Sequence, residues 1–217
     1  MQPRFSRIED ALEALAAGLV VIVVDSEDRE NEGDFVVAAE RITPEIVHFL
    51  VSHGRGQVCM PVASHISKRL KFRPMVSLDQ QQMPNFTLPI DHVSCRTGIS
   101  PVERCATIQA IIDENSVPSD FVCPGHMFPL IARDGGVLVR QGHTEASVDL
   151  VTMAGLRPGA VLCEICSNDG RHMATRDELL AIAKDCRIPI TTIDELVALR
   201  AKEAGGAALA ERKLAAC

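Results

Sequence analysis

The sequence predicts an α/β fold of the α+β type: one three-layer domain in which helices flank a mixed β-sheet. Apolar, β-branched runs alternate with segments of helical periodicity, but not in strict strand–helix–strand order. The run 19–24 has no polar alternation, as expected of a central strand buried on both faces. No linker divides the chain, so we expect a single domain over residues 1–204 and a flexible tail, rich in Gly and Ala, over residues 205–217.

Most of the predicted helices begin at capping signals. Capping boxes start at Ser6, Ser100 and Thr175. Pro follows the caps Thr43 and Ser100, which strengthens both helix starts. Asp194 is expected to cap the last helix. The other predicted helices span residues 7–17, 44–54, 64–70, 101–115, 144–155 and 176–186.

The predicted strands are short apolar runs bounded by turn residues. The residues Asp134-Gly135-Gly136 separate two such runs and predict a hairpin, whereas Cys123-Pro124-Gly125-His126 has the composition of a turn. Residues 71–85 are expected to form a long surface loop. The predicted strands span residues 19–24, 35–39, 57–62, 86–91, 128–132, 137–140, 161–166 and 190–193, with a short one near 172–173.

The composition argues against several classes of protein. The formal net charge is -7 and Trp and Tyr are absent, so neither nucleic-acid backbone binding nor base stacking is favoured. No apolar run is long enough to cross a bilayer and the N-terminus lacks a signal-peptide pattern, so we expect a cytoplasmic protein without a membrane partner. Cys163 and Cys166 have CxxC spacing, but they lie in an apolar run with no second pair, which favours free thiols over zinc.

An acidic loop stands between the first two predicted strands. Residues 25–34 read Asp-Ser-Glu-Asp-Arg-Glu-Asn-Glu-Gly-Asp and hold six carboxylates and one Arg. Hard divalent cations bind oxygen ligands of this kind, and a bound cation would offset the repulsion between the carboxylates. A solvated acidic loop is the commonest alternative for a charge run. The metal interpretation is favoured if other segments complete a site.

Two predicted helix starts offer groups that bind anions. Arg140-Gln141-Gly142-His143-Thr144 combines a guanidinium, a hydroxyl and a glycine at the start of a helix, where free N–H groups favour phosphate. In that segment His143 is either a metal ligand or an ordinary turn residue. Arg96-Thr97-Gly98-Ile99-Ser100 is a second candidate, although capping by Ser100 also explains it.

Two further residues suggest acid–base chemistry. His126 follows a Pro-Gly pair and titrates near neutral pH, but a structural turn histidine is the alternative. Glu164 interrupts the apolar run 161–166. A carboxylate there is either paired, metal-bound or shifted in pKa, or it faces water at a sheet edge.

Four segments, taken together and in this order, resemble the 3,4-dihydroxy-2-butanone 4-phosphate synthase family, the riboflavin-pathway enzymes that use ribulose 5-phosphate. The resemblance covers essentially the whole chain from Ile8 to Arg200. A fused GTP cyclohydrolase II domain, frequent in this family, is not evident after Arg200, so we expect the stand-alone form. The segments are Asp28-Arg29-Glu30-Asn31-Glu32-Gly33-Asp34, Arg96-Thr97-Gly98-Ile99-Ser100, Pro124-Gly125-His126 and Gly142-His143-Thr144-Glu145-Ala146.

The resemblance implies a homodimer with active sites at the subunit interface and Mg²⁺ or Mn²⁺ as cofactor. By position, Glu30 and His143 would be the protein ligands of the metal. Thr97 and the segment 140–144 would hold the substrate phosphate, and Cys59 would line the site. The residues implied to contact substrate are Arg29, Glu30, Asp34, Cys59, Thr97, Arg140, Gln141, Gly142, His143, Thr144 and Glu164.

The implied reaction converts D-ribulose 5-phosphate to L-3,4-dihydroxy-2-butanone 4-phosphate and formate. A metal that chelates neighbouring oxygens acidifies the adjacent C–H, and Glu32 or Asp34 would remove that proton. His126 and Glu164 would be essential to catalysis. Loss of water, a shift of the carbon skeleton and release of C4 as formate would follow. The acidic loop is expected to order over the bound substrate.

One segment departs from the family pattern and keeps alternatives open. Where the family usually has Gly-Val-Thr before the position of Thr97, this chain has His92-Val93-Ser94-Cys95-Arg96. Arg96 adds a positive charge near the expected phosphate, which favours tighter binding or another anionic substrate. The alternatives are therefore a related sugar-phosphate lyase or isomerase, a non-catalytic ligand-binding homologue, and a zinc-binding regulator built on the cysteines.

Overall fold

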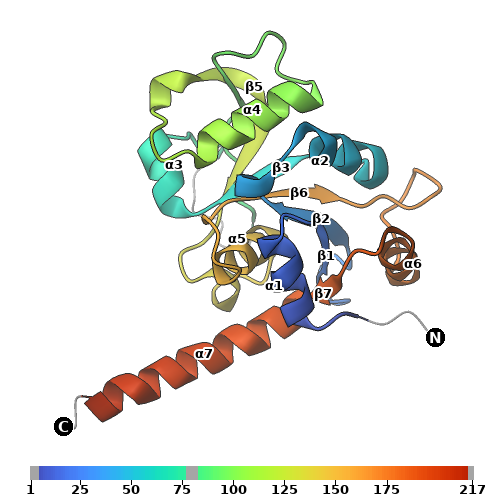
Figure 1. The fold of residues 1–217 in the computed structure, drawn as a ribbon, viewed down its shortest axis with the longest axis vertical. Coiled ribbons are helices and arrows are strands. Elements are labelled where there is room, and N and C mark those ends of the chain that lie inside the picture. Colours follow the sequence, from blue (N-terminus) through green and yellow to red (C-terminus); the bar gives the residue numbers. More distant parts are fainter. Residues whose placement is uncertain (1–4, 77–82, 215–217) are drawn as a thin grey trace.

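Seven strands pair into one mixed sheet in the order β4-β5-β3-β6-β2-β1-β7 (Figure 1). The computed structural model describes residues 5–76 and 83–214, with side chains through residue 205. β1 runs parallel to β7 and β3 runs parallel to β5, while the other neighbours are antiparallel, as the predicted fold class requires. The strands are β1 (Val21–Val24), β2 (Gly33–Ala38), β3 (Cys59–Val62), β4 (Ile90–His92), β5 (Phe121–Ile131), β6 (Ala160–Glu164) and β7 (Ile190–Thr192).

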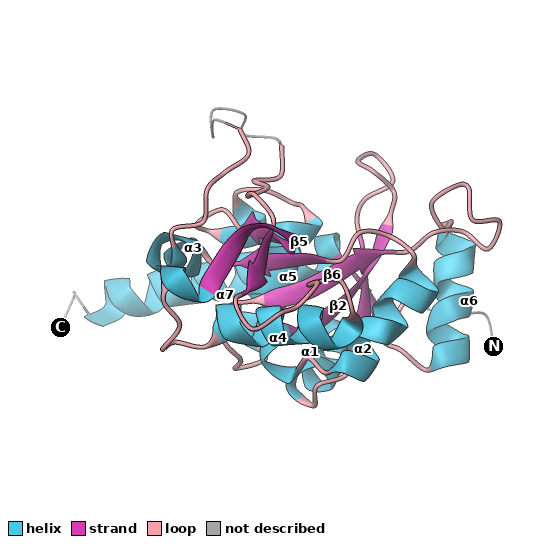
Figure 2. Cartoon of the chain, turned by 90° about the horizontal axis from the view of Figure 1, so that it is seen from above, coloured by secondary structure: helices cyan, strands magenta, loops and turns pink. Residues whose placement is uncertain are grey.

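Helices cover both faces of the sheet, which confirms the predicted three layers (Figures 1 and 2). α1, α5 and α7 pack on one face, and α2, α3, α4 and α6 pack on the other. The helices are α1 (Ile8–Ala16), α2 (Pro44–Phe49), α3 (Ser64–Leu70), α4 (Pro101–Ile112), α5 (His143–Met153), α6 (Arg176–Cys186) and α7 (Ile193–Leu214). Shorter helical turns are η1 (Ala39–Arg41), the π-helical η2 (Leu50–Gly54), η3 (Pro118–Asp120) and η4 (Gly136–Leu138).

β1 shows why an unbroken apolar run forms a central strand here. Ile22 and Val24 join the core on the side of α2, α4 and α6, whereas Val21 and Val23 join the core on the side of α1, α5 and α7. All four side chains are at most 1% exposed. Burial of one such side chain stabilises the fold by about 1.5–3 kcal/mol. A strand covered on both faces therefore has no position for a polar residue.

The largest difference from the predicted elements lies around β5. The segment 123–126, predicted as a turn, is part of this strand and lies beside β4. Gly125 permits the close approach, because a Cβ at this position would lie 2.2 Å from the carbonyl carbon of Ile90. The predicted strand 137–140 is instead the turn η4, since Gly135 takes a φ of 98° and redirects the chain towards α5. The predicted hairpin is therefore wrong.

Two helix caps also differ from the prediction. Arg7, rather than Ser6, is the N-cap residue of α1. At the start of α7, the Glu195 N–H donates to the Thr192 hydroxyl at 3.2 Å, so Thr192 rather than Asp194 caps this helix. Both corrections move the cap by one or two positions and leave the helices themselves where the periodicity predicts them.

The C-terminal segment has regular backbone structure. α7 starts beside β7, extends away from the sheet and remains helical to Leu214 (Figure 1). The helix therefore continues through residues 205–214, which belong to the predicted tail. The flexibility of the tail and the domain boundary at residue 204 stay predictions.

The long loop before β4 is described in part. Residues 77–82 of the predicted loop 71–85 lie outside the described residues. Of the predicted strand 86–91, only the end enters β4, while Phe86 and Thr87 form isolated bridges to Leu130 and Pro74. Within residues 5–76 and 83–214, every helix is too short or too polar to cross a membrane.

Candidate active site

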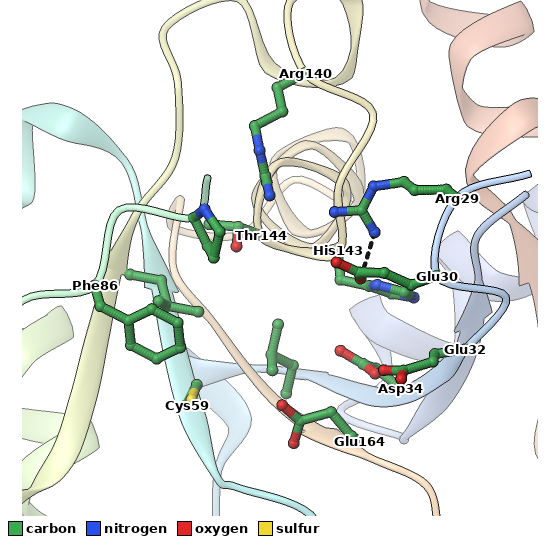
Figure 3. Close-up of a pocket in the computed structure, with 13 residues that line it drawn as sticks. Arg29, Glu30, Glu32, Asp34, Cys59, Phe86, Arg140, His143, Thr144 and Glu164 are labelled. Carbon is green, nitrogen blue, oxygen red and sulfur yellow. Dashed lines mark hydrogen bonds and ion pairs between the residues drawn. The ribbon is translucent and has the colours of Figure 1, made fainter. Parts of the chain in front are cut away.

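A cavity of about 280 Å³ opens where the acidic loop, the first turn of α5 and the sheet meet (Figure 3). Carboxylates gather on one side of it, and the Arg140 guanidinium reaches in from another. The lining residues are Arg29, Glu30, Glu32, Asp34, Cys59, Pro84, Phe86, Leu130, Arg140, His143, Thr144, Leu162 and Glu164. The structure thus brings together nine of the residues predicted from sequence, which come from four separate segments.

The paired strands place two carboxylates and a thiol on the floor of the cavity. Asp34 of β2 lies opposite Glu164 of β6, and Cys59 of β3 lies opposite Leu162. Leu162 and Glu164 share one face of the sheet because side chains alternate along a strand. β6 lies between β3 and β2, so the alternative of Glu164 at a sheet edge is wrong.

Asp34 is a buried carboxyl group among other carboxylates. It is 3% exposed, and its Oδ1 atom has no hydrogen-bond partner among the described residues. Burial, followed by the negative charges of Glu164 and Glu32, raises the pKa of Asp34 well above 3.8. Burial and the charge of Glu30 likewise raise the pKa of Glu32 above 4.5. Both groups are therefore shifted towards the pH range in which proton transfer is efficient.

Glu164 is held in place from the segment that precedes β3. The Gln57 N–H donates to Oε2 of Glu164 at 2.7 Å. Gly56 leaves room for this carboxylate, because a Cβ at Gly56 would lie 2.6 Å from the same oxygen. The carboxylate consequently has a fixed position at the end of β6.

The acidic loop folds around one of its own carboxylates. Asp25 is 1% exposed, and its Oδ2 accepts hydrogen bonds from Arg29 Nη1 at 2.9 Å and from the Glu30 N–H at 3.1 Å. Its Oδ1 accepts from the Glu32 N–H at 2.8 Å. Arg29 also pairs with Glu30 at 2.5 Å. The loop is therefore a closed turn with Asp25 at its centre, and its other carboxylates point outward or into the cavity.

Asp25, Glu30 and His143 form a group whose ligand atoms all lie within 4.8 Å of one another. The Nε2 of His143 lies 3.2 Å from the carbonyl oxygen of Val23 and donates to it, which leaves Nδ1 with a free lone pair. Burial lowers the pKa of His143 and favours its neutral form. A neutral imidazole oriented by a carbonyl, together with two carboxylates, is a donor set that suits Mg²⁺ or Mn²⁺.

The first turn of α5 forms the part of the cavity that can bind an anion. Gly142 is the N-cap and offers no side chain to the free N–H groups of this turn, where His143 and Thr144 lie. Arg140 is buried beside it and pairs with Glu145 at 2.6 Å. A Cβ at Gly142 would lie 2.2 Å from Arg140 Nη1, so the glycine allows the guanidinium to approach the helix.

Four of the predicted site residues do not line the cavity. Gln141 and Gly142 lie next to it in the chain, between Arg140 and His143. Thr97 and His126 belong to the opposite end of the sheet, near β4 and β5. The Thr97 hydroxyl donates to Glu103 Oε2 at 2.8 Å. Within a single chain, these last two residues are therefore separate from the cavity.

Two functional candidates were not predicted from sequence. Asp91 holds His126 through two contacts, at 2.7 Å between Oδ2 and Nδ1 and at 2.9 Å from the His126 N–H to Oδ1. Asp25 joins Glu30 in the metal-binding group. Its position directly after a buried strand was the available signal, whereas Asp91 stood in the sequence only as the polar end of an apolar run.

The cysteines are free thiols throughout the described residues. The candidate metal group contains no cysteine, so the structure gives no support to a zinc site at the CxxC spacing. Burial raises the pKa of Cys163 to about 12 and raises that of Cys59 still further. Both thiols are therefore protonated at neutral pH.

Comparisons with known proteins agree with this geometry. A family description of 3,4-dihydroxy-2-butanone 4-phosphate synthase matches residues 9–199. The riboflavin biosynthesis protein RibBA of Bacillus subtilis is 51% identical over 197 residues, and RibBA of Bacillus mycoides is 52% identical over 197 residues. Each match covers 90% of this chain and 49% of the relative. The chain thus spans about half the length of the curated relatives it matches.

Solved structures give the same result. RibBX of A. baumannii, a two-domain 3,4-dihydroxy-2-butanone 4-phosphate synthase, aligns with a TM-score of 0.87 and 42% identity over 90% of this chain and 58% of that chain. A 3,4-dihydroxy-2-butanone 4-phosphate synthase in complex with two magnesium ions aligns with a TM-score of 0.86 and 36% identity, covering 93% of this chain and 99% of that chain.

Proposed function

We propose that this chain, which belongs to the 3,4-dihydroxy-2-butanone 4-phosphate synthase family, converts D-ribulose 5-phosphate to L-3,4-dihydroxy-2-butanone 4-phosphate and formate. The observation that carries the proposal is a carboxylate–imidazole group and an uncapped helix N-terminus beside Arg140 in one cavity. The names of the curated relatives support a place for this reaction in riboflavin biosynthesis.

The two ends of the cavity suit the two ends of the substrate. The N–H groups at the start of α5, the Thr144 hydroxyl and Arg140 hold the phosphate. The hydroxyl and carbonyl oxygens of the sugar then extend towards Glu30 and His143. Gln141 and Gly142 act through the backbone of the turn that carries these groups.

Asp25, Glu30 and His143 would hold Mg²⁺ or Mn²⁺. Glu30 and His143 are the ligands expected from sequence, and Asp25 adds a third oxygen donor. The magnesium-bound structure of a family member supports this cofactor. When bound, the ion supplies Lewis-acid polarisation of the substrate oxygens. Glu30 and Asp25 share Arg29 as an ion-pair partner, which keeps the two carboxylates together.

The carboxylates of the acidic loop and of the cavity floor perform the proton transfers. Glu32 and Asp34 have raised pKa values, so either of them can take a proton from carbon and return it later in the reaction. Glu164, fixed by the Gln57 N–H, faces the same space. The overall reaction loses one water, shifts the carbon skeleton and uses one water to release C4 as formate, so its atoms balance.

The functional unit proposed here is a homodimer with a composite site. Since Thr97 and His126 lie away from the cavity of their own chain, a second copy would bring them to it. His126 has a 42% exposed side chain, as a residue that meets a second chain requires. Exposed apolar residues on the segment that joins β4 to α4 and in the first turn of α4 would be covered in the same contact; they are Val93, Ile99 and Val102.

We place the enzyme in the cytoplasm, with a small sugar phosphate as its partner. A phosphorylated sugar does not cross membranes unaided, so its enzymes work where it is made. The net charge of -7 offers no attraction to a nucleic-acid backbone.

Formate release from ribulose 5-phosphate, with and without Mg²⁺, tests the proposal. The wild type should release formate only with a divalent cation, and Glu30→Gln should lose this activity because a metal ligand is neutralised. Asp28→Asn is the matched control, since Asp28 belongs to the same exposed loop but does not line the cavity. Full activity of Glu30→Gln, or products only from a different pentose phosphate, would overturn the assignment.

A further inference from the structure

The acidic loop has few connections to the rest of the protein. Its hydrogen bonds are mostly internal, centred on Asp25. Ser26, Arg29 and Asn31 add one short turn and a left-handed residue with a φ of 54° at Asn31. A loop that carries Glu30 and Glu32 on such a turn needs an external contact to keep a defined position.

Arg176, the first residue of α6, supplies that contact. Its Nη2 donates to the backbone carbonyl of Asp25 at 2.8 Å, and its Nε donates to Asn31 Oδ1 at 3.2 Å. Nε also lies 3.5 Å from Glu27 Oε1. The guanidinium therefore joins the beginning, the middle and the end of the loop.

Arg176 is itself held where it can do this. Its guanidinium lies 5.9 Å from the centre of the Phe5 ring, and its side chain is 28% exposed. α6 starts at a complete capping box formed by Thr175 and Glu178, which fixes the helix end that carries Arg176. Within residues 5–76 and 83–214, the side-chain hydrogen bonds that connect the acidic loop (residues 25–32) to another helix or strand come from Arg176.

We propose that Arg176 is a positioning residue that holds the acidic loop so that Asp25 and Glu30 meet His143, and that it thereby sets the affinity for the divalent cation. The inference rests on the proposed function for the role of the metal. Two hydrogen bonds connect Arg176 to Glu30. Arg176 donates to the backbone carbonyl of Asp25, and the carboxylate of Asp25 accepts from the Glu30 N–H. Release of this contact frees the loop without removing any ligand.

Arg176 could affect the metal affinity through its charge or through the position of the loop. The two effects change the affinity in opposite directions when Arg176 is replaced, which makes the inference testable. Removal of a cation near a metal site, by itself, strengthens the binding of another cation. Displacement of the loop that carries the ligands weakens the binding of the cation. Loss of groups that orient metal ligands typically lowers the affinity 10–100-fold. Because Arg176 acts through the loop, we expect the lower end of that range.

The experiment measures the dissociation constant of Mn²⁺, with free Mn²⁺ followed by electron paramagnetic resonance, for the wild type and three variants. Arg176→Ala should bind Mn²⁺ about tenfold more weakly. Arg176→Lys keeps the charge but not the fork of donors, so it should also bind more weakly than the wild type. Arg69→Ala is the matched control, because Arg69 also donates to backbone carbonyls, at the end of α4, and it should bind as the wild type does.

Hydrogen exchange in metal-free protein gives a second readout. The Glu30 and Glu32 amides should exchange faster in Arg176→Ala than in the wild type, and unchanged exchange would overturn the inference. Equal or tighter Mn²⁺ binding by Arg176→Ala, or wild-type binding by Arg176→Lys, would also overturn it. Failure of the proposed function would appear as no formate from the wild type, and neither readout here depends on that assay.

Discussion

Asp34→Asn should stabilise the metal-free protein while it lowers the rate of formate release. The carboxyl group of Asp34 is 3% exposed, one of its oxygens has no hydrogen-bond partner among the described residues, and its pKa is raised well above 3.8. A raised carboxyl pKa means that the folded state resists ionisation while the unfolded chain ionises freely. The group therefore destabilises the fold at neutral pH, and the neutral amide removes that cost.

The size of the effect follows from burial. Each unit of pKa difference between folded and unfolded states corresponds to about 1.4 kcal/mol. The amide keeps one polar atom without a partner, which offsets part of the gain by about 1–3 kcal/mol. We expect an increase in the free energy of unfolding at pH 7.5 within the range of about 0.5–3 kcal/mol that single substitutions usually produce, and for a chain of this length a gain of 2 kcal/mol raises the melting temperature by roughly 4–8 °C.

Urea unfolding in EDTA at two pH values measures this effect. Below the unfolded-state pKa of 3.8, Asp34 is protonated in both the folded and the unfolded chain, so it does not destabilise the fold. The destabilisation grows as the pH rises from 3.8 towards the folded-state pKa. The difference between Asp34→Asn and the wild type should therefore be small at pH 4 and larger at pH 7.5. A variant that is less stable than the wild type at pH 7.5, or a difference that is the same at both pH values, would refute the reasoning.

Three further substitutions or treatments test other parts of the site. Asp91→Asn should lower kcat for formate release by about 10²–10⁴-fold with little change in KM, since His126 loses the carboxylate that holds it at 2.7 Å. Gly56→Ala should lower kcat by about 10²-fold, because the new Cβ would lie 2.6 Å from Glu164 Oε2 and displace this carboxylate. Cys59 should react with iodoacetamide at pH 8 far more slowly than exposed thiols, because burial raises its pKa.

Each of these expectations has a clear contrary result. Wild-type kcat in Asp91→Asn would show that the carboxylate does not orient His126 for the reaction. Normal kcat in Gly56→Ala would mean that the position of Glu164 is not critical. Rapid alkylation of Cys59, identified by peptide mass spectrometry, would contradict its burial. Circular dichroism of each variant provides the control for folding.

Much of the fold was predictable because its signals are local. The apolar run of β1 and the capping box at Thr175 each report their own element within a few residues. β5 escaped prediction because Pro124 and Gly125 favour turns, and their strand conformation depends on the neighbouring β4. Whether Gly135 leads to a hairpin or a turn towards α5 likewise depends on tertiary packing, which no local pattern reports.

The candidate site shows the same division. The acidic loop and the segment 140–144 are continuous motifs, and the structure brings both to one cavity. Asp25 enters the metal-binding group only because the loop closes on itself. Asp91 reaches His126 across 35 residues of chain through the pairing of β4 and β5, a relation that exists only in the folded sheet.

The register between β2 and β6 gives this site two mechanically different halves. Asp34 and Glu164 belong to interior strands, so strand pairing on both sides fixes their backbone positions. A slip of either strand by one residue would turn its carboxylate to the opposite face of the sheet. The acidic loop above them is short, and its conformation depends on a few hydrogen bonds. The floor is therefore the rigid part of the site and the acidic loop is the adaptable part. Homologues that use another sugar phosphate should differ in the acidic loop and keep the floor residues.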